Sequence, residues 1–259
     1  MTAPTALFSD RLFTAAAPVW RACLQHPFVQ GIADGTLAQD KFRHYLKQDY
    51  VYLVEYCKVF ALGAAKSPDL DTMGLFSSLL HGTLHLEMDL HRAYAAEFGI
   101  APLELERTEA SAALTGYTSY MLSVAQAGGV ENAAAAVLAC AWSYSFIGRE
   151  LARSHPASLQ HPFYGKWVQM YSSPEFTALA ERCIALVNRL SAGKPEHELQ
   201  ALEDIVRKTS AFEYLFWDMA DRLELWPVPC TAGIFGASGA SVVGAAPQGG
   251  APGQGAVQG

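Results

Sequence analysis

Apolar residues recur along this chain every three or four positions, and no stretch alternates between apolar and polar residues for long. The first pattern is typical of amphipathic α-helices, and the lack of the second argues against β-strands. Gly, Pro and short polar clusters mark the helix ends. The sequence therefore predicts an all-α fold with helices at residues 9–25, 36 or 40–66, 71–98, 109–127, 131–154, 163–171, 175–190 and 196–225.

The first of these helices is expected to begin with Ser9 as its N-cap, and residues 26–35 are expected to form a connection through Gly31 and Gly35. From Thr231 to the end, the chain has no charged residue and is rich in Gly, Ala, Gln and Pro. Such a composition cannot bury enough apolar surface to order itself. We therefore predict one all-α domain at residues 1–230 and a flexible tail at 231–259.

Two acidic residues stand inside the apolar stripes of long predicted helices. Asp49 lies in the middle of the stripe of the helix that ends at residue 66, and Glu213 lies in the stripe of the last helix. An ionised carboxylate in an apolar setting is costly unless it is paired or hydrogen-bonded. Tyrosine hydroxyls or backbone groups could satisfy each acid alone, but two inward acids on different helices favour a shared cavity.

Further polar side chains share these inward faces. By helical spacing, Tyr52 leans the same way as Asp49, Tyr117 belongs to the stripe of its own helix, and Cys140 shares a face with Tyr144. A cavity with a thiol, two carboxylates, several phenols and aromatic walls suits a flat, nitrogen-rich heterocycle. Because free cysteine is often buried as a small hydrophobe, Cys140 is either a packing residue or a nucleophile.

The segment "HGTLHLEMDLH" has the histidine content of a metal site. At about 100° per residue, His81 and His85 fall on one face of a helix, whereas Glu87 and His91 fall on nearly the opposite face. These four residues therefore cannot share one ion, and the sequence offers no Glu-x-x-His pairs from other helices for a two-metal bundle. We expect no metal and no cofactor.

The charge distribution and the cysteines indicate in which compartment the protein works and which partners it is not expected to bind. The net charge of −7 comes from scattered acids, with no Lys/Arg cluster that would bind nucleic acid. The longest uncharged apolar stretch, residues 133–147, is shorter than the roughly 20 residues of a membrane helix. No secretory signal and no CxxC motif are evident, so we expect a cytoplasmic protein with free thiols at Cys23, Cys57, Cys140, Cys183 and Cys230.

The chain resembles thiaminase II, the TenA family of thiamine-salvage enzymes, over roughly residues 7–227. Five segments carry the resemblance in the family's order and with compatible spacing, and together they are specific. They are "HPFVQGIADGTLAQDKFRHYLKQDYVYL", "GYTSYM", "CAWSYSFIG", "HPFYGKWVQMYSS" and "FEYLFWDMA". The resemblance implies a haem-oxygenase-like multi-helix bundle, a homotetramer, and the branch of the family that has the cysteine.

Carried over by position, the resemblance also assigns roles to the inward-facing residues. Cys140 would be the nucleophile and Glu213 the acid/base residue, and Asp49 would bind the aminopyrimidine edge. Tyr171, seven residues after Tyr164, would join the other tyrosines in the site. The residues that would line or orient the site are Tyr52, Tyr117, Tyr144 and Tyr171.

The implied reaction is hydrolysis of 4-amino-5-aminomethyl-2-methylpyrimidine to the 5-hydroxymethyl pyrimidine and ammonia, with thiamine as a second substrate. A thiolate that adds at ring carbon 6 breaks the aromaticity, which allows the amine to leave from the neighbouring methylene. Two alternatives stay open from the residues. One is a metal-dependent oxidase of haem-oxygenase-like fold that uses His81 or Glu87, and the other is a non-catalytic protein that binds a pyrimidine or thiamine.

Overall fold

The computed structural model describes residues 7–228, except for the side chain of Leu86. Within that range the chain forms helices and no strand, which confirms the all-α prediction. The helices are α1 (Phe8–Leu24), α2 (Pro27–Asp34), α3 (Gln39–Ala65), α4 (Leu70–Gly82), a π-helical segment η1 (Thr83–Glu87), α5 (Met88–Glu97), α6 (Pro102–Glu106), α7 (Ala112–Ala127), α8 (Val130–Ser154), a 3₁₀ segment η2 (Pro156–Gln160), α9 (Gly165–Ser172), α10 (Pro174–Ser191) and α11 (Glu196–Asp221).

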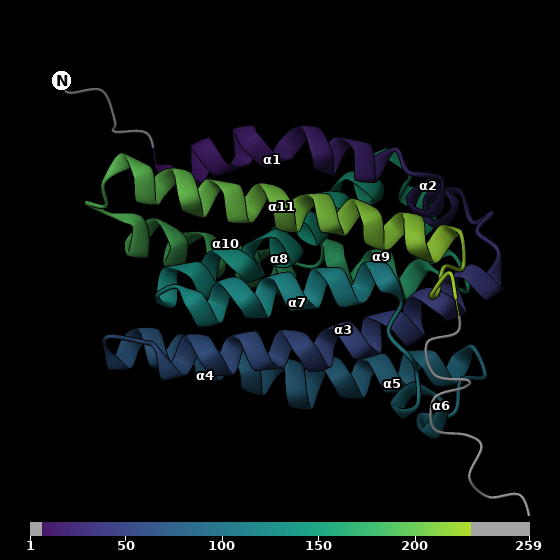
Figure 1. Cartoon of the computed structure of the whole chain (residues 1–259). Helices are drawn as coiled ribbons and strands as arrows, with labels where there is room; N and C mark the ends of the chain where they lie inside the picture. Colours follow the sequence, from purple (N-terminus) through teal and green to yellow (C-terminus); the bar gives the residue numbers. More distant parts are fainter. Residues whose placement is uncertain (1–6, 229–259) are drawn as a thin grey trace, which may run out of the picture. The chain divides into compact units, whose positions relative to one another are not determined.

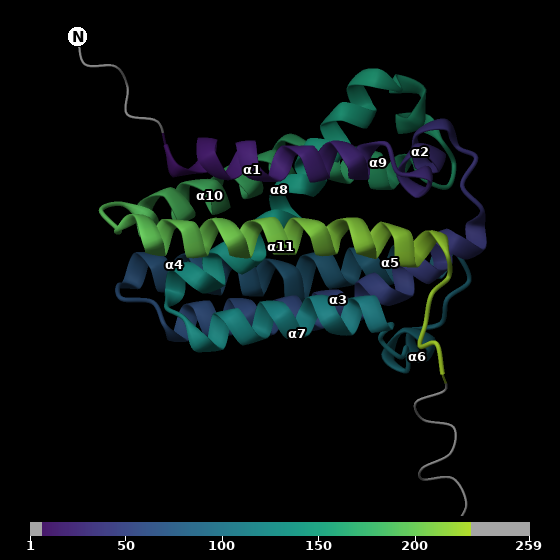
Figure 2. The same cartoon turned by 45° about the horizontal axis from the view of Figure 1, so that its top comes forward.

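The long helices run side by side around α8 (Figures 1 and 2). Helix α8 packs against α3, α7, α9, α10 and α11, and α4 and α5 follow one another along α3. Small side chains let these helices approach closely, and residues 133–136 of α8 are four buried alanines. At Gly148 of α8, an added Cβ would lie 2.5 Å from the carbonyl carbon of Tyr171 in α9. This close approach fixes α9, and with it Tyr171, against the core.

By length and composition alone, α8 is apolar enough to cross a membrane, with a mean hydropathy of 1.2 in its most apolar window. However, 72% of that window is buried inside the protein. The apolar character of α8 is therefore accounted for by its place at the centre of the bundle, where it contacts other helices on several sides.

Residues 26–35, predicted as a connection, contain the short helix α2. The prediction was wrong because the local signals for a helix were overlooked. The His26 side chain accepts a hydrogen bond from the Phe28 backbone N–H, Pro27 occupies the first turn, and Gly35 ends the helix with a φ of 80°. Pro at the first turn and a left-handed Gly after the end are the usual order for a short helix.

Two predicted helix starts also differ from the structure. Leu7 precedes α1 as its N-cap, and Ser9 lies inside the first turn, where its backbone N–H donates to Asn188. Helix α7 starts at Ala112, three residues later than predicted, because the Ser111 hydroxyl accepts a hydrogen bond from the Leu114 backbone N–H and caps it.

The single helix predicted at residues 71–98 is interrupted by the π-helical segment η1. A π-helical turn holds one extra residue and so rotates the following helix relative to the preceding one, which a single α-helical period does not predict. The chain's contacts define a first compact unit at residues 1–225. The predicted domain boundary at residue 230 and the predicted tail at 231–259 lie outside the described residues.

Candidate functional site

The structure buries the predicted site residues on five helices. Asp49 is 7% exposed and Glu213 only 2%, although both carry carboxyl groups. Cys140 of α8 is half-buried. The tyrosines are also buried, and they come from α3 (Tyr52), α7 (Tyr117), α8 (Tyr144) and α9 (Tyr171). The inward orientation that the helical stripes predict for both acids is therefore confirmed.

Glu213 accepts a short hydrogen bond from a tyrosine. The Tyr117 hydroxyl donates to Oε1 of Glu213 at 2.6 Å, and the Tyr52 hydroxyl donates in turn to the Tyr117 oxygen at 3.4 Å. Burial raises the pKa of Glu213 to about 7, while the bond from Tyr117 partly opposes this rise. A carboxyl that titrates near neutral pH can both take and give a proton during a reaction.

Cys140 lies within the electrostatic reach of both predicted carboxyls. Burial raises the pKa of its thiol well above the usual value, the charge of Glu213 raises it further, and Asp49 contributes in the same direction. Hydrogen bonding by Tyr52 opposes these effects. Cys140 is therefore held as a thiol, and a nucleophilic thiolate requires a base during the reaction.

Asp49 faces His91 of α5, with 3.4 Å between its Oδ2 and Nδ1 of the imidazole. Nε2 of His91 lies 2.8 Å from the carbonyl oxygen of Leu46 and donates to it, so Nδ1 carries a lone pair. Burial lowers the pKa of His91 to about 4. Burial also raises the pKa of Asp49, and the charges of Glu87 and Glu213 raise it further. Burial, the neighbouring charges and the lone pair of His91 together favour a neutral Asp49 carboxyl that donates its proton towards Nδ1.

Two neighbouring cavities open at this place. The first has a volume of about 460 Å³ and is lined by Asp49, Tyr171 and further residues of α3, α5 and α9. The second, of about 480 Å³, is lined by Cys140 and by residues of α3, α4, η1 and α10. We call them the Asp49 chamber and the Cys140 chamber. Glu87, Leu90 and Met170 line both, so the two chambers meet along these side chains.

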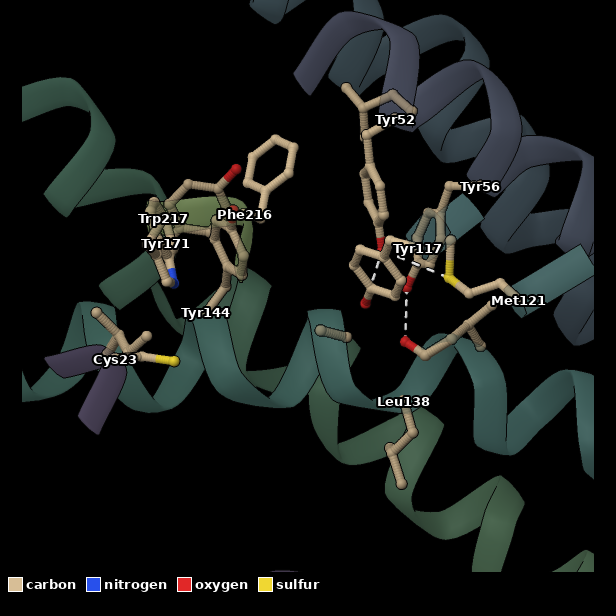
Figure 3. Close-up of a cluster of buried hydrophobic side chains, with 14 of the residues drawn as sticks. Cys23, Tyr52, Tyr56, Tyr117, Met121, Leu138, Tyr144, Tyr171, Phe216 and Trp217 are labelled. Carbon is tan, nitrogen blue, oxygen red and sulfur yellow. Dashed lines mark hydrogen bonds between the residues drawn. The ribbon is translucent and has the colours of Figure 1, made fainter. Parts of the chain in front are cut away.

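Glu213 and three of the predicted tyrosines, Tyr52, Tyr117 and Tyr144, are not part of the walls of these two chambers. They lie in the next layer of side chains. Figure 3 shows two groups of aromatic rings there, one with Tyr144 and Tyr171, the other with Tyr52 and Tyr117. The ring centroids are 4.7 Å apart in the first pair and 5.2 Å apart in the second.

The structure distinguishes Tyr171 from Tyr164. Tyr171 lines the Asp49 chamber, and the charges of Tyr45 and Asp49 are among the causes that raise its pKa, after burial. The Tyr164 hydroxyl instead donates to the backbone carbonyl of Leu37, and its ring stacks on His161 at 4.9 Å. Of the two, Tyr171 is thus the tyrosine that faces the chamber, as the resemblance implies.

Sequence reasoning missed three residues of this site. Tyr45 lines the Asp49 chamber, and its oxygen accepts a hydrogen bond from Trp167 Nε1 at 3.2 Å. Glu87 and His91 also line that chamber. A usable signal was present, because Tyr45 precedes Asp49 by four residues and Glu87 precedes His91 by four, a spacing that puts each pair on one helix face.

The histidine-rich segment divides only in part as the helical wheel predicts, because His81 and Glu87 both line the Cys140 chamber. The rings of His81 and His85 lie next to each other, with centroids 4.6 Å apart, whereas Glu87 and His91 face the Asp49 chamber. Between residues 7 and 228, no group of three or more His, Cys, Asp or Glu side chains has an arrangement that could hold a metal ion. The residues present do not fit the metal centre of an oxidase.

Comparison with known proteins now identifies the family. The family model described as TENA/THI-4/PQQC matches residues 14–223. The chain belongs to this family. One TENA/THI-4/PQQC relative, named aminopyrimidine aminohydrolase, from Halalkalibacterium halodurans, is 48% identical over 219 residues, which cover 85% of this chain and 97% of the relative.

Solved structures share the fold of this chain. A TenA homologue from P. horikoshii OT3 has a TM-score of 0.76 and 27% sequence identity, covering 84% of this chain and 99% of the homologue. A domain with a heme oxygenase-like fold from Shewanella denitrificans has a TM-score of 0.69 at 13% identity, covering 85% of this chain and 94% of that domain. The second likeness concerns the fold alone, and it confirms the haem-oxygenase-like bundle that the resemblance implies.

Proposed function

We propose that this protein is an aminopyrimidine aminohydrolase, a thiaminase II of thiamine salvage. It converts 4-amino-5-aminomethyl-2-methylpyrimidine to the 5-hydroxymethyl pyrimidine and ammonia, and it hydrolyses thiamine by the same path. One observation supports the proposal above the others. Asp49 and Cys140 line two chambers that meet at Glu87, Leu90 and Met170, and the buried Glu213 raises the pKa of both groups.

Asp49 binds the aminopyrimidine edge. That edge offers one acceptor, a ring nitrogen, next to one donor, the exocyclic amine. A neutral carboxyl offers the complementary pair, an O–H donor and a carbonyl acceptor. His91 stabilises this neutral form by accepting the O–H at Nδ1, and when the substrate binds, that O–H turns from Nδ1 to the ring nitrogen. The aromatic rings of Tyr45 and Tyr171 supply flat surfaces for the ring.

Cys140 is the nucleophile and Glu213 moves its proton. The thiol gives its proton to the Glu213 carboxylate as the sulfur forms a bond to ring carbon 6. Glu213 then passes that proton to a ring nitrogen, which receives the ring electrons. Glu213 suits this exchange because its pKa of about 7 leaves both protonation states populated at neutral pH.

The remaining steps restore the ring. The electrons released by the addition expel the amine from the methylene carbon, and that carbon–nitrogen bond breaks. Water adds to the methylene and gives up a proton, the ring nitrogen loses its proton, and the sulfur leaves carbon 6 as a thiolate that is reprotonated. Tyr117 and Tyr52 hold the Glu213 carboxyl through their chained hydroxyl groups during these transfers.

A product assay tests the proposed function. Purified protein is incubated with the aminomethylpyrimidine, and separately with thiamine, with and without a metal chelator. From the aminomethylpyrimidine we expect ammonia and the hydroxymethylpyrimidine in equal amounts, and from thiamine the hydroxymethylpyrimidine and the thiazole, at rates that the chelator does not change. Ligand binding without turnover would favour the non-catalytic binding protein, and loss of activity with chelator would favour the metal-dependent oxidase.

We also propose that the protein is a cytoplasmic homotetramer. Exposed apolar side chains on α4, such as Leu70 at 82% and Met73 at 39%, support self-association. Light scattering of the purified protein at several concentrations tests the assembly, and a monomer at every concentration would contradict it.

A further inference from the structure

Glu87 is a carboxyl at the centre of this site for which the reaction above has no use. It is the last residue of the π-helical segment η1, between α4 and α5. Its Oε2 accepts a hydrogen bond of 3.2 Å from the hydroxyl of Thr83, the first residue of the same segment. Single turns of π-helix inside α-helices occur frequently at functional sites. The irregular turn therefore draws attention to the side chain at its end.

The position of Glu87 is shared by the two chambers. Among the side chains that the structure describes, Glu87, Leu90 and Met170 line both chambers, and Glu87 is the one of these three that carries an ionisable group. The charge of Glu87 acts on Asp49 from one side and on Cys140 from the other, since it contributes to raising both of their pKa values. Leu90 is 61% exposed, so the wall that the chambers share extends to the surface.

Within the described residues, Glu87 forms no ion pair with a basic side chain. Lys166, on the wall of the Asp49 chamber, pairs with Glu97 instead. Burial raises the pKa of Glu87 to about 7, and the Thr83 hydroxyl only partly opposes this rise. A buried carboxyl that lacks a cation gains the most from a ligand that brings one.

The connectivity of the substrate ring leads to a specific ligand group. Ring carbon 4 carries the amine of the edge that Asp49 binds, and ring carbon 6 is the atom that Cys140 attacks. Carbon 5 lies between these two atoms, so its methylene substituent points between Asp49 and Cys140. Glu87 lies on the wall between the Asp49 chamber and the Cys140 chamber.

We propose that Glu87 binds the ammonium group on the methylene carbon of the aminomethylpyrimidine, the group that leaves in the reaction. This inference rests on the proposed function. An alkylamine is protonated at neutral pH, and it pairs with the Glu87 carboxylate through charge-assisted hydrogen bonds. The pair lies on the wall that reaches the surface at Leu90, so the released ammonia has a short way out.

Glu87 thereby discriminates between leaving groups. A primary ammonium donates hydrogen bonds to the carboxylate, whereas the quaternary nitrogen of the thiazolium in thiamine has no hydrogen to donate. The hydroxymethyl product is neutral, so it lacks the ammonium charge that pairs with Glu87. Removal of the Glu87 charge should therefore weaken binding of the aminomethyl substrate most and binding of the hydroxymethyl product least.

Binding measurements in a variant that cannot react test this assignment. Dissociation constants of the aminomethylpyrimidine and the hydroxymethylpyrimidine are measured by calorimetry for Cys140→Ser and for Cys140→Ser with Glu87→Gln. The control is Cys140→Ser with Asp89→Asn, which removes one charge from the neighbouring turn at a side chain that is 72% exposed. Turnover of both substrates is measured in Glu87→Gln with Cys140 intact.

We expect Glu87→Gln to weaken binding of the aminomethylpyrimidine by about 10- to 100-fold and binding of the hydroxymethylpyrimidine by less than about 3-fold. In Glu87→Gln with Cys140 intact, kcat/KM should fall more for the aminomethyl substrate than for thiamine. The control Asp89→Asn should change none of the measured values by more than about 2-fold. Equal weakening of both ligands, or no weakening, would overturn the assignment.

Two further results keep this test separate from the proposed function. If Glu87→Gln does not fold, the Cys140→Ser protein alone must still bind the aminomethyl ligand at least about 10-fold more tightly than the hydroxymethyl ligand, and equal affinities would overturn the role of Glu87. If wild-type protein releases no ammonia, the proposed hydrolase fails, but the preference of Cys140→Ser for the ammonium ligand remains measurable.

Discussion

The hydroxyl of Tyr117 donates a hydrogen bond of 2.6 Å to Oε1 of Glu213, and both side chains are nearly inaccessible to solvent. This bond stabilises the ionised form of the carboxyl against the cost of its burial. The pKa of Glu213 near 7 is thus a balance between burial and Tyr117. Changes on either side of this balance should be visible in the pH dependence of the reaction.

Tyr117→Phe should raise the pKa of Glu213, because the bond that favours the carboxylate is lost. The acidic limb of the kcat/KM profile should move to higher pH, and kcat/KM at pH 7 should fall by about 10-fold, the worth of one hydrogen bond to a charged group. The measurement is a pH–rate profile of both proteins. Tyr120→Phe, on the same helix, serves as the control, and an unshifted Tyr117→Phe profile would contradict the role of this bond.

Glu213 should make the free energy of unfolding of the protein depend on pH. Burial raises its pKa from the ordinary 4.5 of an exposed, unfolded glutamate to about 7, so the native protein keeps a proton that the unfolded chain releases. Stability from this group is therefore present below about pH 4.5 and is lost as the pH rises to 7, by up to about 3 kcal/mol. Urea unfolding at pH 4.5 and 8 should show a larger loss for wild type than for Glu213→Gln, and equal losses would contradict this account.

Glu213→Gln should also lower kcat by about 10²- to 10⁴-fold, since the amide cannot accept the thiol proton or deliver it to the ring. Binding of the hydroxymethylpyrimidine should change little, because Asp49 and the aromatic walls remain. Turnover and product binding measured on the same preparation separate the two effects. A variant that retains wild-type kcat would exclude Glu213 as the acid/base residue.

Asp49→Asn should retain most of the binding of the hydroxymethylpyrimidine, within about 5-fold, whereas Asp49→Ala should weaken it by about 10-fold or more. The reason is that an amide, like a neutral carboxyl, offers one donor and one acceptor to the aminopyrimidine edge. Calorimetric titration of the two variants measures the difference. If Asn and Ala weaken binding equally, Asp49 acts as an ionised carboxylate.

Gly148→Ala should destabilise the protein and weaken substrate binding. The new Cβ would lie 2.5 Å from the Tyr171 carbonyl carbon, so α9 must move away from α8. Overpacking of this kind costs about 1–3 kcal/mol, and Tyr171 would shift at the chamber wall. Thermal unfolding and KM are the measurements. Gly74→Ala, where an added Cβ meets nothing within 4 Å, is the control and should leave both unchanged or raise the stability.

The sequence was sufficient to locate most of the site because helical periodicity is a direct record of which side chains face inward. Asp49 and Glu213 interrupt apolar stripes, and a charged residue at such a position is informative in any all-α chain. The same pattern could not say that the two acids meet, since the distance between helices is not encoded in the period of either one. Two inward acids favoured a shared cavity, but the structure puts Asp49 on the wall of one chamber and Glu213 on the wall of neither.

Glu87 and His91 show where the sequence reasoning ended. The helical wheel separates them from His81 and His85, and the structure keeps this separation only in part, since His81 lines the Cys140 chamber together with Glu87. However, their partner Asp49 is 42 residues away from His91 in the chain, and the π-helical turn at Thr83–Glu87 changes the rotation of the helix before α5. Contacts between distant segments and irregular turns both require coordinates.

The central claim is that Cys140 attacks the ring, and one comparison tests it most directly. Rates of ammonia release at saturating aminomethylpyrimidine are measured for wild type and Cys140→Ser, together with the affinity of each for the hydroxymethylpyrimidine, with Cys57→Ser as the control thiol. We predict that Cys140→Ser binds the product within about 3-fold of wild type but loses at least about 10³-fold in rate. A Cys140→Ser protein that still releases ammonia within about 10-fold of the wild-type rate would contradict covalent catalysis by this thiol.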